Sequence, residues 1–187
     1  GSRLLTDRGL VSVEPLQPGA LVMTRDDGLQ PLRWIGSRQV QARGRFAPIQ
    51  IRAGALGDHG DLWVSPQHRV LLSNGMAEMP FGAHEVLVAA KDLVNDRSIT
   101  RKPGGEVTYV HVLFDDHQLV TSEGLVTESF LPGPQTSRQF DHDVLNELQA
   151  LFPDLDPCTG EGYGPAVRPS LRSYEARLLS ATLDTRI

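Results

Sequence analysis

A serine and a histidine three residues apart, Ser65 and His68, form the first pattern in this sequence that could do chemistry. They stand at the start of a predicted strand. A neutral imidazole there can donate to the nitrogen of a nearby peptide bond, while the hydroxyl steadies adjacent polar groups. Such a pair twists or polarises an amide so that a neighbouring nucleophile attacks it. The alternative is a core histidine bonded to backbone carbonyls, with Ser65-Pro66 as a strand entry.

A second histidine, His117, directly follows two carboxylates, Asp115 and Asp116. A carboxylate within reach favours the charged imidazolium and makes it a better proton source. The alternative is that the three residues form a solvated turn. Tyr109 and His111 lie two residues apart on the preceding predicted strand and so share a face, where packing is the commoner role of a histidine.

The sequence favours neither a metal ion nor any other cofactor. Its histidines lack a tight ligand spacing such as His-Glu-x-x-His. A single cysteine, Cys158, excludes a cysteine-based zinc site and an internal disulfide framework. The Gly-Xaa-Ser-Xaa-Gly motif of α/β-hydrolases is missing. We therefore expect any catalysis to use side chains alone.

Length, composition and charge limit the class of protein. The chain has 187 residues, of which 40% are hydrophobic, so it can bury a core. A net charge of −5 and scattered basic residues give no reason to expect nucleic acid as a partner. No apolar run approaches the roughly 18 residues of a membrane span. We expect a monomer.

The histidine strand occurs twice in the sequence. Segments 64–75 and 113–124 align His68 with His117, Val70 with Leu119, Leu71 with Val120, Ser73 with Ser122 and Gly75 with Gly124. Each copy is predicted to be a strand pair with a histidine at its entry and a glycine turn at its exit. An earlier repeat matches the spacing of Val11, Leu16 and Val22 with that of Val88, Leu93 and Ile99. The repeats predict a pseudo-twofold all-β module.

Turn residues divide the rest of the chain into short elements. Asp27-Gly28 and Asn74-Gly75 are strong hairpin signals. Ile49-Gln-Ile51 is a strand candidate, and residues 81–93 could hold a short helix. Leu131-Pro-Gly-Pro134 is typical of a linker. We therefore divide the chain into a β domain, residues 1–133, and a C-terminal extension, residues 134–187.

Two short helices are expected in the extension. Apolar residues at helical spacing predict the first helix, which Pro153 ends: Val144, Leu145, Leu148, Leu151 and Phe152. Ser170 is the expected N-cap of the second, with Leu171, Tyr174 and Leu178 on one face. Because isolated helices of this length are marginal, both are expected to pack on the β domain.

The order of these motifs resembles the Hint superfamily, the Hedgehog/intein autoprocessing fold, and most closely the bacterial Hint-type domains of larger proteobacterial proteins. The carrying segments include Val13-Glu-Pro-Leu-Gln-Pro-Gly19, Arg33-Trp-Ile-Gly36, Val64-Ser-Pro-Gln-His-Arg-Val-Leu-Leu72, Tyr109-Val-His-Val-Leu-Phe-Asp-Asp-His117 and Glu128-Ser-Phe-Leu-Pro-Gly133. The resemblance covers nearly the whole chain. It implies an all-β, pseudo-twofold, disc-like Hint fold with a small C-terminal helical appendage.

The resemblance also implies a mechanism. In this family a cysteine or serine at the first position of the domain attacks the preceding carbonyl and forms a thioester or ester. Water, a small molecule or a protein nucleophile then cleaves that bond. The Thr-x-x-His motif of the first half matches Ser65-x-x-His68, and the second-half histidine matches His117. By this resemblance His68 polarises the amide, Ser65 supports it, and His117 with Asp115 or Asp116 assists proton transfer.

Three positions depart from the family pattern. The nucleophile would lie upstream of Gly1, because Ser2 lies too far into the motif and Cys158 is in the extension, so we expect this chain alone to be inactive. Ser65 replaces threonine and keeps the hydroxyl. The closing His-Asn pair falls at about Thr127-Glu128. Neither side chain cyclises as asparagine does, which argues against splicing with C-terminal release.

The sequence thus predicts a Hint-type autoprocessing domain, a single-turnover autoproteolytic unit whose substrate is its own upstream polypeptide. The first alternative is a catalytically inactive Hint module that serves as an interaction domain. The second is an unrelated hydrolase with a histidine–carboxylate site, which would act on an external ester or amide. The sequence identifies no compartment, and a secreted or cell-surface position within a larger bacterial protein is the setting we consider.

Overall fold

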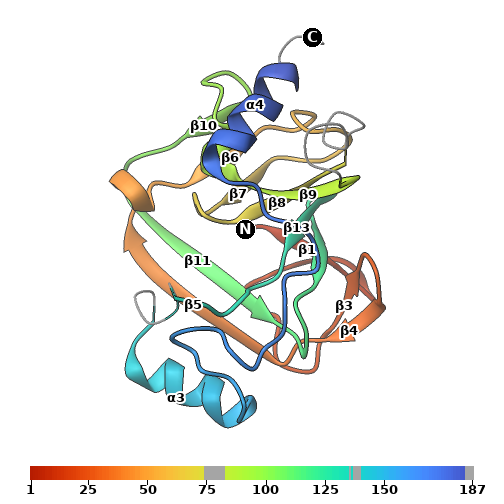
Figure 1. The fold of residues 1–187 in the computed structure, drawn as a ribbon, viewed down its shortest axis with the longest axis vertical. Helices are drawn as coiled ribbons and strands as arrows, with labels where there is room; N and C mark the ends of the chain where they lie inside the picture. The colour runs from red at the N-terminus through yellow and green to blue at the C-terminus, as the bar shows by residue number, and fades with distance from the viewer. Residues whose placement is uncertain (74–82, 135, 137–139, 184–187) are drawn as a thin grey trace.

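The computed structural model describes residues 1–73, 83–134, 136 and 140–183. Within these residues the chain forms antiparallel strands, two short 3-10 helices and two α-helices (Figure 1). The largest sheet has eight strands, in the order β2-β1-β3-β12-β13-β8-β9, with β4 paired to β3. Their bounds are β1 Arg3–Thr6, β2 Gly9–Ser12, β3 Leu21–Thr24, β4 Gly28–Pro31, β8 Arg69–Ser73, β9 Glu85–Ala89, β12 Leu119–Ser122 and β13 Leu125–Glu128.

Two smaller sheets complete the β domain. One has the order β10-β6-β7, with bounds Ile99–Arg101, Ile49–Ile51 and Leu62–Val64. The other pairs the two long strands, β5 (Trp34–Gln41) and β11 (Glu106–Leu113), along their whole length. The 3-10 helices are η1 (Gly44–Phe46) and η2 (Ala90–Leu93), and the α-helices are α3 (His142–Leu151) and α4 (Ser173–Leu183). The all-β fold with a small helical appendage is therefore confirmed.

The two histidine strands lie in one sheet. The β12–β13 hairpin turns through Glu123 and Gly124, whose φ values are 50° and 90°. Two successive positive φ values are characteristic of the tight turns that match the twist of antiparallel strands, and glycine adopts them without steric cost. β13 pairs with β8 at Thr127 and Val70. β8 and β12, the strands that follow His68 and His117, therefore flank β13 on its two sides.

Local signals predicted several elements. The Asp27-Gly28 signal marks the β3–β4 hairpin, and Ile49-Gln-Ile51 is β6. In the described part of 81–93, which could hold a short helix, Ala90–Leu93 is a 3-10 helix and Glu85–Ala89 is strand β9. Pairing of β9 with β8, which buries 86–89, limits the helix to this one turn. The Asn74-Gly75 turn lies outside the described residues.

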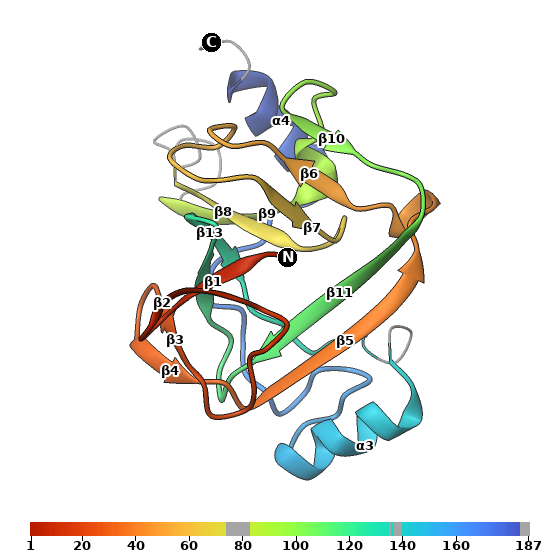
Figure 2. The ribbon, with the colours of Figure 1, turned by 180° about the vertical axis from the view of Figure 1, so that it is seen from behind.

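The C-terminal extension packs along the β domain, with α3 and α4 at opposite ends of the molecule (Figure 1, Figure 2). Leu145 and Leu148 of α3 join a buried cluster that includes Trp34. The chain then runs beside β9, where the Leu87 N–H donates to the Pro169 carbonyl and the Leu171 N–H donates to the Leu87 carbonyl. The two expected helices are thus present, although the second begins at Ser173 rather than directly after Ser170.

The division at residue 133 stays a prediction, because the extension and the β domain share apolar clusters. No helix in the described ranges has the length and apolar character needed to cross a bilayer.

Candidate functional site

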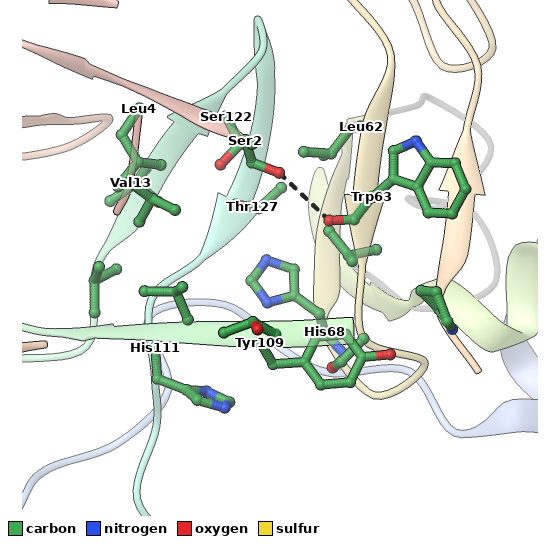
Figure 3. Close-up of a pocket in the computed structure, with 18 of the residues that line it drawn as sticks. Ser2, Leu4, Val13, Leu62, Trp63, His68, Tyr109, His111, Ser122 and Thr127 are labelled. Carbon is green, nitrogen blue, oxygen red and sulfur yellow. Dashed lines mark hydrogen bonds between the residues drawn. The ribbon is translucent and has the colours of Figure 1, made fainter. Parts of the chain in front are cut away.

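The Ser65–His68 turn and the first residues of the chain share a pocket of about 220 Å³. The chain enters β1 near the middle of the molecule (Figure 2). The first residues there, Gly1 and Ser2, line the pocket. Figure 3 shows the His68 side chain between the strand that carries Tyr109 and His111 and the segments that carry Ser2 and Thr127. Ser2 donates to the Trp63 carbonyl at 3.4 Å, which ties the start of β1 to β7.

Ser65 holds the backbone of the turn that presents His68. The backbone N–H of His68 donates to the Ser65 hydroxyl at 3.2 Å and to the Ser65 carbonyl at 3.1 Å. From the other side, η2 donates through the N–H groups of Ala90 and Lys91 to the carbonyls of His68 and Pro66. Ser and Thr hydroxyls close turns in this way because the short side chain reaches a backbone N–H nearby. These hydrogen bonds therefore fix the position of the His68 backbone, from which the imidazole projects.

His68 carries a neutral imidazole at neutral pH. Its pKa is lowered, first because burial disfavours the charged ring and then because Arg69 and His117 lie nearby, while Glu128 opposes the change. A neutral imidazole holds one donor and one acceptor nitrogen. It can therefore donate to a peptide nitrogen or take a proton from a nucleophile.

Glu128 lies between the two histidines at the heart of the site. Its buried carboxylate accepts from the Arg69 backbone N–H at 3.0 Å and from the Arg69 guanidinium at 3.1 and 3.3 Å. Burial alone would raise the pKa of Glu128, but His117, Arg69 and His68 outweigh it and the pKa is lowered. The Glu128 carboxylate is therefore ionised and interacts electrostatically with both His68 and His117.

His117 contacts Glu128 rather than the two aspartates that precede it. Its Nε2 lies 3.7 Å from a Glu128 oxygen, close enough for an electrostatic contact but too long for a hydrogen bond. Asp115 is exposed and pairs with Arg33 at 3.1 Å, and Asp116 is also exposed. The structure therefore does not bring Asp115 or Asp116 to the His117 ring, and a role for them in the site stays a prediction.

Glu128 entered the sequence analysis only as the residue in place of a closing asparagine. A signal for its position was present, because a tight turn at Gly124 sets the β12–β13 register. That register places Glu128 opposite Leu119, two residues after His117. The β12–β13 register, counted back from the turn at Gly124, therefore predicts that Glu128 lies close to His117.

His111 forms a second wall of the site and lines a neighbouring pocket. Its ring packs edge-on against Phe130 and Phe140, with centroids 5.1 Å apart in each case. Its pKa is lowered to about 4, mainly by burial and further by His68 and Arg38. The neighbouring pocket, of about 420 Å³, shares His68, His111 and Glu128 with the first and is lined also by residues of the extension: Thr159, Gly160 and Gly164.

Two buried polar atoms near the site have no hydrogen-bond partner. In the described parts of the chain, His117 Nε2 and Thr127 Oγ1 are two of three such side-chain atoms. Thr127 lines the pocket beside His68, whereas His117 is not among the residues that line it. Buried polar atoms are normally paired, so the Thr127 hydroxyl marks a place in the pocket where an incoming group can bond. The same described ranges contain no cluster of three or more His, Cys, Asp or Glu side chains arranged to hold a metal ion.

Comparisons with known proteins identify a sequence family and several similar structures. A family model described as "Hint domain" matches residues 1–134. No curated protein matches the chain. The solved MchDnaB-1 intein is 11% identical over 69% of this chain and 96% of its own, with a TM-score of 0.44. A bacterial intein-like domain from Clostridium thermocellum is 14% identical over 70% of this chain and 95% of its own, with a TM-score of 0.43.

Proposed function

The chain belongs to the Hint domain family, and on this premise we propose that it cleaves a peptide bond upstream of its own β domain by an acyl shift. A cysteine or serine upstream of Gly1 attacks the carbonyl carbon of the residue before it. A C–S or C–O bond forms, the C–N bond breaks, and the amine nitrogen takes a proton. Water, a small molecule or a protein nucleophile then breaks the thioester or ester.

One observation carries the proposal: the residues before β1 lie in the same pocket as His68. Gly1 and Ser2 line it together with Ser65 and His68. A segment that precedes Gly1 would enter the molecule here, so a nearby upstream peptide bond comes within reach of the imidazole. Proximity of this kind is what converts a slow amide attack into an intramolecular step.

We assign a role to His68 and a role to Ser65 on the basis of their contacts. The neutral His68 ring takes the proton that the attacking thiol or hydroxyl loses, and as imidazolium it gives that proton to the amine nitrogen as the C–N bond breaks. Ser65 acts through the backbone, because its hydroxyl holds the His68 N–H. It is therefore a positioning residue, a role that threonine would fill equally well.

The second half supports proton transfer through His117 and Glu128. The carboxylate lies 3.7 Å from His117 Nε2 and lines the pocket that contains His68. It stabilises positive charge that develops on either ring during the shift. Because a glutamate does not release a chain by cyclisation as asparagine does, we propose cleavage on the N-terminal side without splicing.

The test is mass spectrometry of the full chain extended upstream of Gly1. We expect the unsubstituted protein to cleave and His68→Ala to stay intact, because removal of a general acid costs about 10²- to 10⁴-fold in rate. His142→Ala is the matched control, since His142 is exposed at the start of α3 and away from the pocket. It should cleave like the unsubstituted protein.

Two outcomes would overturn the proposal. An intact mass in every variant, with the fold retained by circular dichroism, would favour the inactive interaction module. Turnover of an external ester or amide by residues 1–187 alone, again lost in His68→Ala, would favour the hydrolase.

A further inference from the structure

The C-terminal extension donates a hydrogen bond to the buried ring of His117. The backbone N–H of Val167 donates to His117 Nδ1 at 3.2 Å, across a sequence separation of 50 residues. His117 is 1% exposed, so water cannot replace this donor. We propose that the extension is a positioning device for His117, in which the Val167 amide fixes the tautomer and orientation of the ring. The catalytic consequence rests on the proposed function, whereas the tautomer does not.

The hydrogen bond determines where the ring proton lies. A nitrogen that accepts an N–H must present a lone pair, so Nδ1 is unprotonated and the proton of the neutral ring is on Nε2. Nε2 is the atom that faces Glu128 at 3.7 Å. The extension therefore directs the one ring N–H of His117 toward the Glu128 carboxylate, which also lies near His68. With the other tautomer, a lone pair would face that carboxylate and the ring could not donate there.

The residues that follow Val167 anchor this part of the chain to the β domain. The Arg168 guanidinium contacts Asp26 at 2.8 Å and Glu85 at 2.7 Å, and it also donates to the Val167 carbonyl at 2.9 Å. One ion pair near the surface contributes little alone, but here two pairs act together with the backbone hydrogen bonds of Pro169 and Leu171 to β9. The donor is thus fixed relative to the sheet that carries His117.

Val167 lies outside residues 1–134, the range that matches the Hint domain model. Its side chain packs on the cluster formed by Leu71, Leu87 and Leu119. Leu119 is on the strand that follows His117. Val167 therefore packs on a cluster that includes this strand, while its amide donates to the imidazole. The extension therefore completes the environment of a residue that belongs to the β domain.

The test compares Val167→Pro with Val167→Ala in the full chain. Proline removes the N–H, whereas alanine keeps the N–H and removes only methyl groups. Long-range ¹H–¹⁵N NMR of the imidazoles reports the tautomer, and the His117 signals are assigned by their loss in His117→Gln. We expect the Nε2–H tautomer in the unsubstituted protein and in Val167→Ala, and a mixture of tautomers in Val167→Pro.

Cleavage of the upstream-extended protein gives the second readout. We expect Val167→Pro to slow cleavage by about 10- to 100-fold, the range found when a partner that orients a metal-bound histidine is removed. Val167→Ala should stay within about twofold of the unsubstituted rate, because it keeps that partner. If proline prevents folding, an ester in place of the 166–167 amide removes the same N–H and keeps the valine side chain.

The outcomes separate the two proposals. An Nδ1–H tautomer in the unsubstituted protein, or an unchanged tautomer without the Val167 N–H, would overturn the positioning role even if cleavage occurs. A tautomer that changes as expected in a protein that never cleaves would support the positioning role and overturn the proposed function.

Discussion

At the scale of single residues, the site is organised around one carboxylate that both halves of the β domain share. Glu128 accepts from the residue after His68 and faces His117. The Ser65-x-x-His68 pattern could be predicted from the sequence because its members are close along the chain. The contact between Glu128 and His117 requires the β12–β13 register, and the contact between Val167 and His117 requires the path of the extension. Spacing alone does not provide either.

Two substitutions of Ser65 should distinguish the effect of its hydroxyl from the effect of its side-chain size. Ser65→Ala removes the acceptor for the His68 N–H. We expect it to lower the free energy of unfolding by about 1 kcal/mol and to slow cleavage, since the turn then holds the ring less firmly. Ser65→Thr keeps the hydroxyl and should preserve both. Urea unfolding and the cleavage time course measure the two effects, and equal behaviour of the two variants would contradict the positioning role.

Glu128→Gln should destabilise the protein in a pH-dependent manner. The glutamine keeps an oxygen for the Arg69 N–H but loses the charge that faces Arg69, His68 and His117. Hydrogen bonds to charged groups are worth about 1.5–3 kcal/mol, and we expect a loss within that range or below it at about pH 7. Because the folded pKa of Glu128 is lowered, this contribution is present above the unfolded pKa and disappears as the pH falls through the folded pKa.

Urea unfolding at about pH 7 and about pH 3 measures this difference. A penalty for Glu128→Gln that is equal at both values would show that the charge of Glu128 contributes no stability.

At the scale of elements, turns could be predicted wherever a glycine sets the backbone. The β3–β4 and β12–β13 hairpins follow from Gly28 and Gly124, whose φ values are 67° and 90°. β9 was not predicted, because its strand conformation depends on pairing with β8, and the Asn74-Gly75 signal after β8 does not fix where the next strand begins. α3 follows from apolar periodicity, which is a local signal.

A glycine in the extension should be essential for the path that carries Val167. Gly162 has φ +84°, and a Cβ there would lie 1.8 Å from the Asp154 carbonyl oxygen. We expect Gly162→Ala to lower the free energy of unfolding by about 1–3 kcal/mol, the usual cost of a strained backbone position. Gly133→Ala is the control, because no atom of the described residues lies within 4 Å of a Cβ added there. Thermal unfolding measures the stability of both variants. Equal stabilities would contradict the need for glycine at position 162.

At the scale of the whole molecule, the site forms where the two halves and the extension meet. The pockets beside His68 take their walls from β1, β11, β13 and the residues after α3. Burial among these elements lowers the pKa values of His68 and His111. The sequence repeats predicted the all-β class, but not which segments would enclose the imidazoles.

The stability of the protein should fall as the pH drops from about 6.5 to about 4, in part through His111. Burial lowers the pKa of His111 to about 4 in the folded protein, from about 6.5 for an imidazole in water. Between these values the unfolded chain binds the proton and the folded chain does not, so each unit of pH decrease favours unfolding, by at most about 1.4 kcal/mol for this one group.

His111→Phe removes this titration and fits the ring cluster of Phe130 and Phe140. Urea unfolding over this pH range should show a shallower pH dependence in the variant, with the contribution of His68 remaining in both proteins. Parallel curves would contradict a buried neutral His111.

The most direct test of the proposed acyl shift is to trap the acyl group. The chain extended upstream of Gly1 is incubated with hydroxylamine, and the released upstream fragment is measured by mass spectrometry. A thioester or ester predicts a fragment that ends in a hydroxamate, formed faster as hydroxylamine increases and absent in His68→Ala. Release of the free acid alone at an unchanged rate, or no release from the folded protein, would contradict an acyl shift at this site.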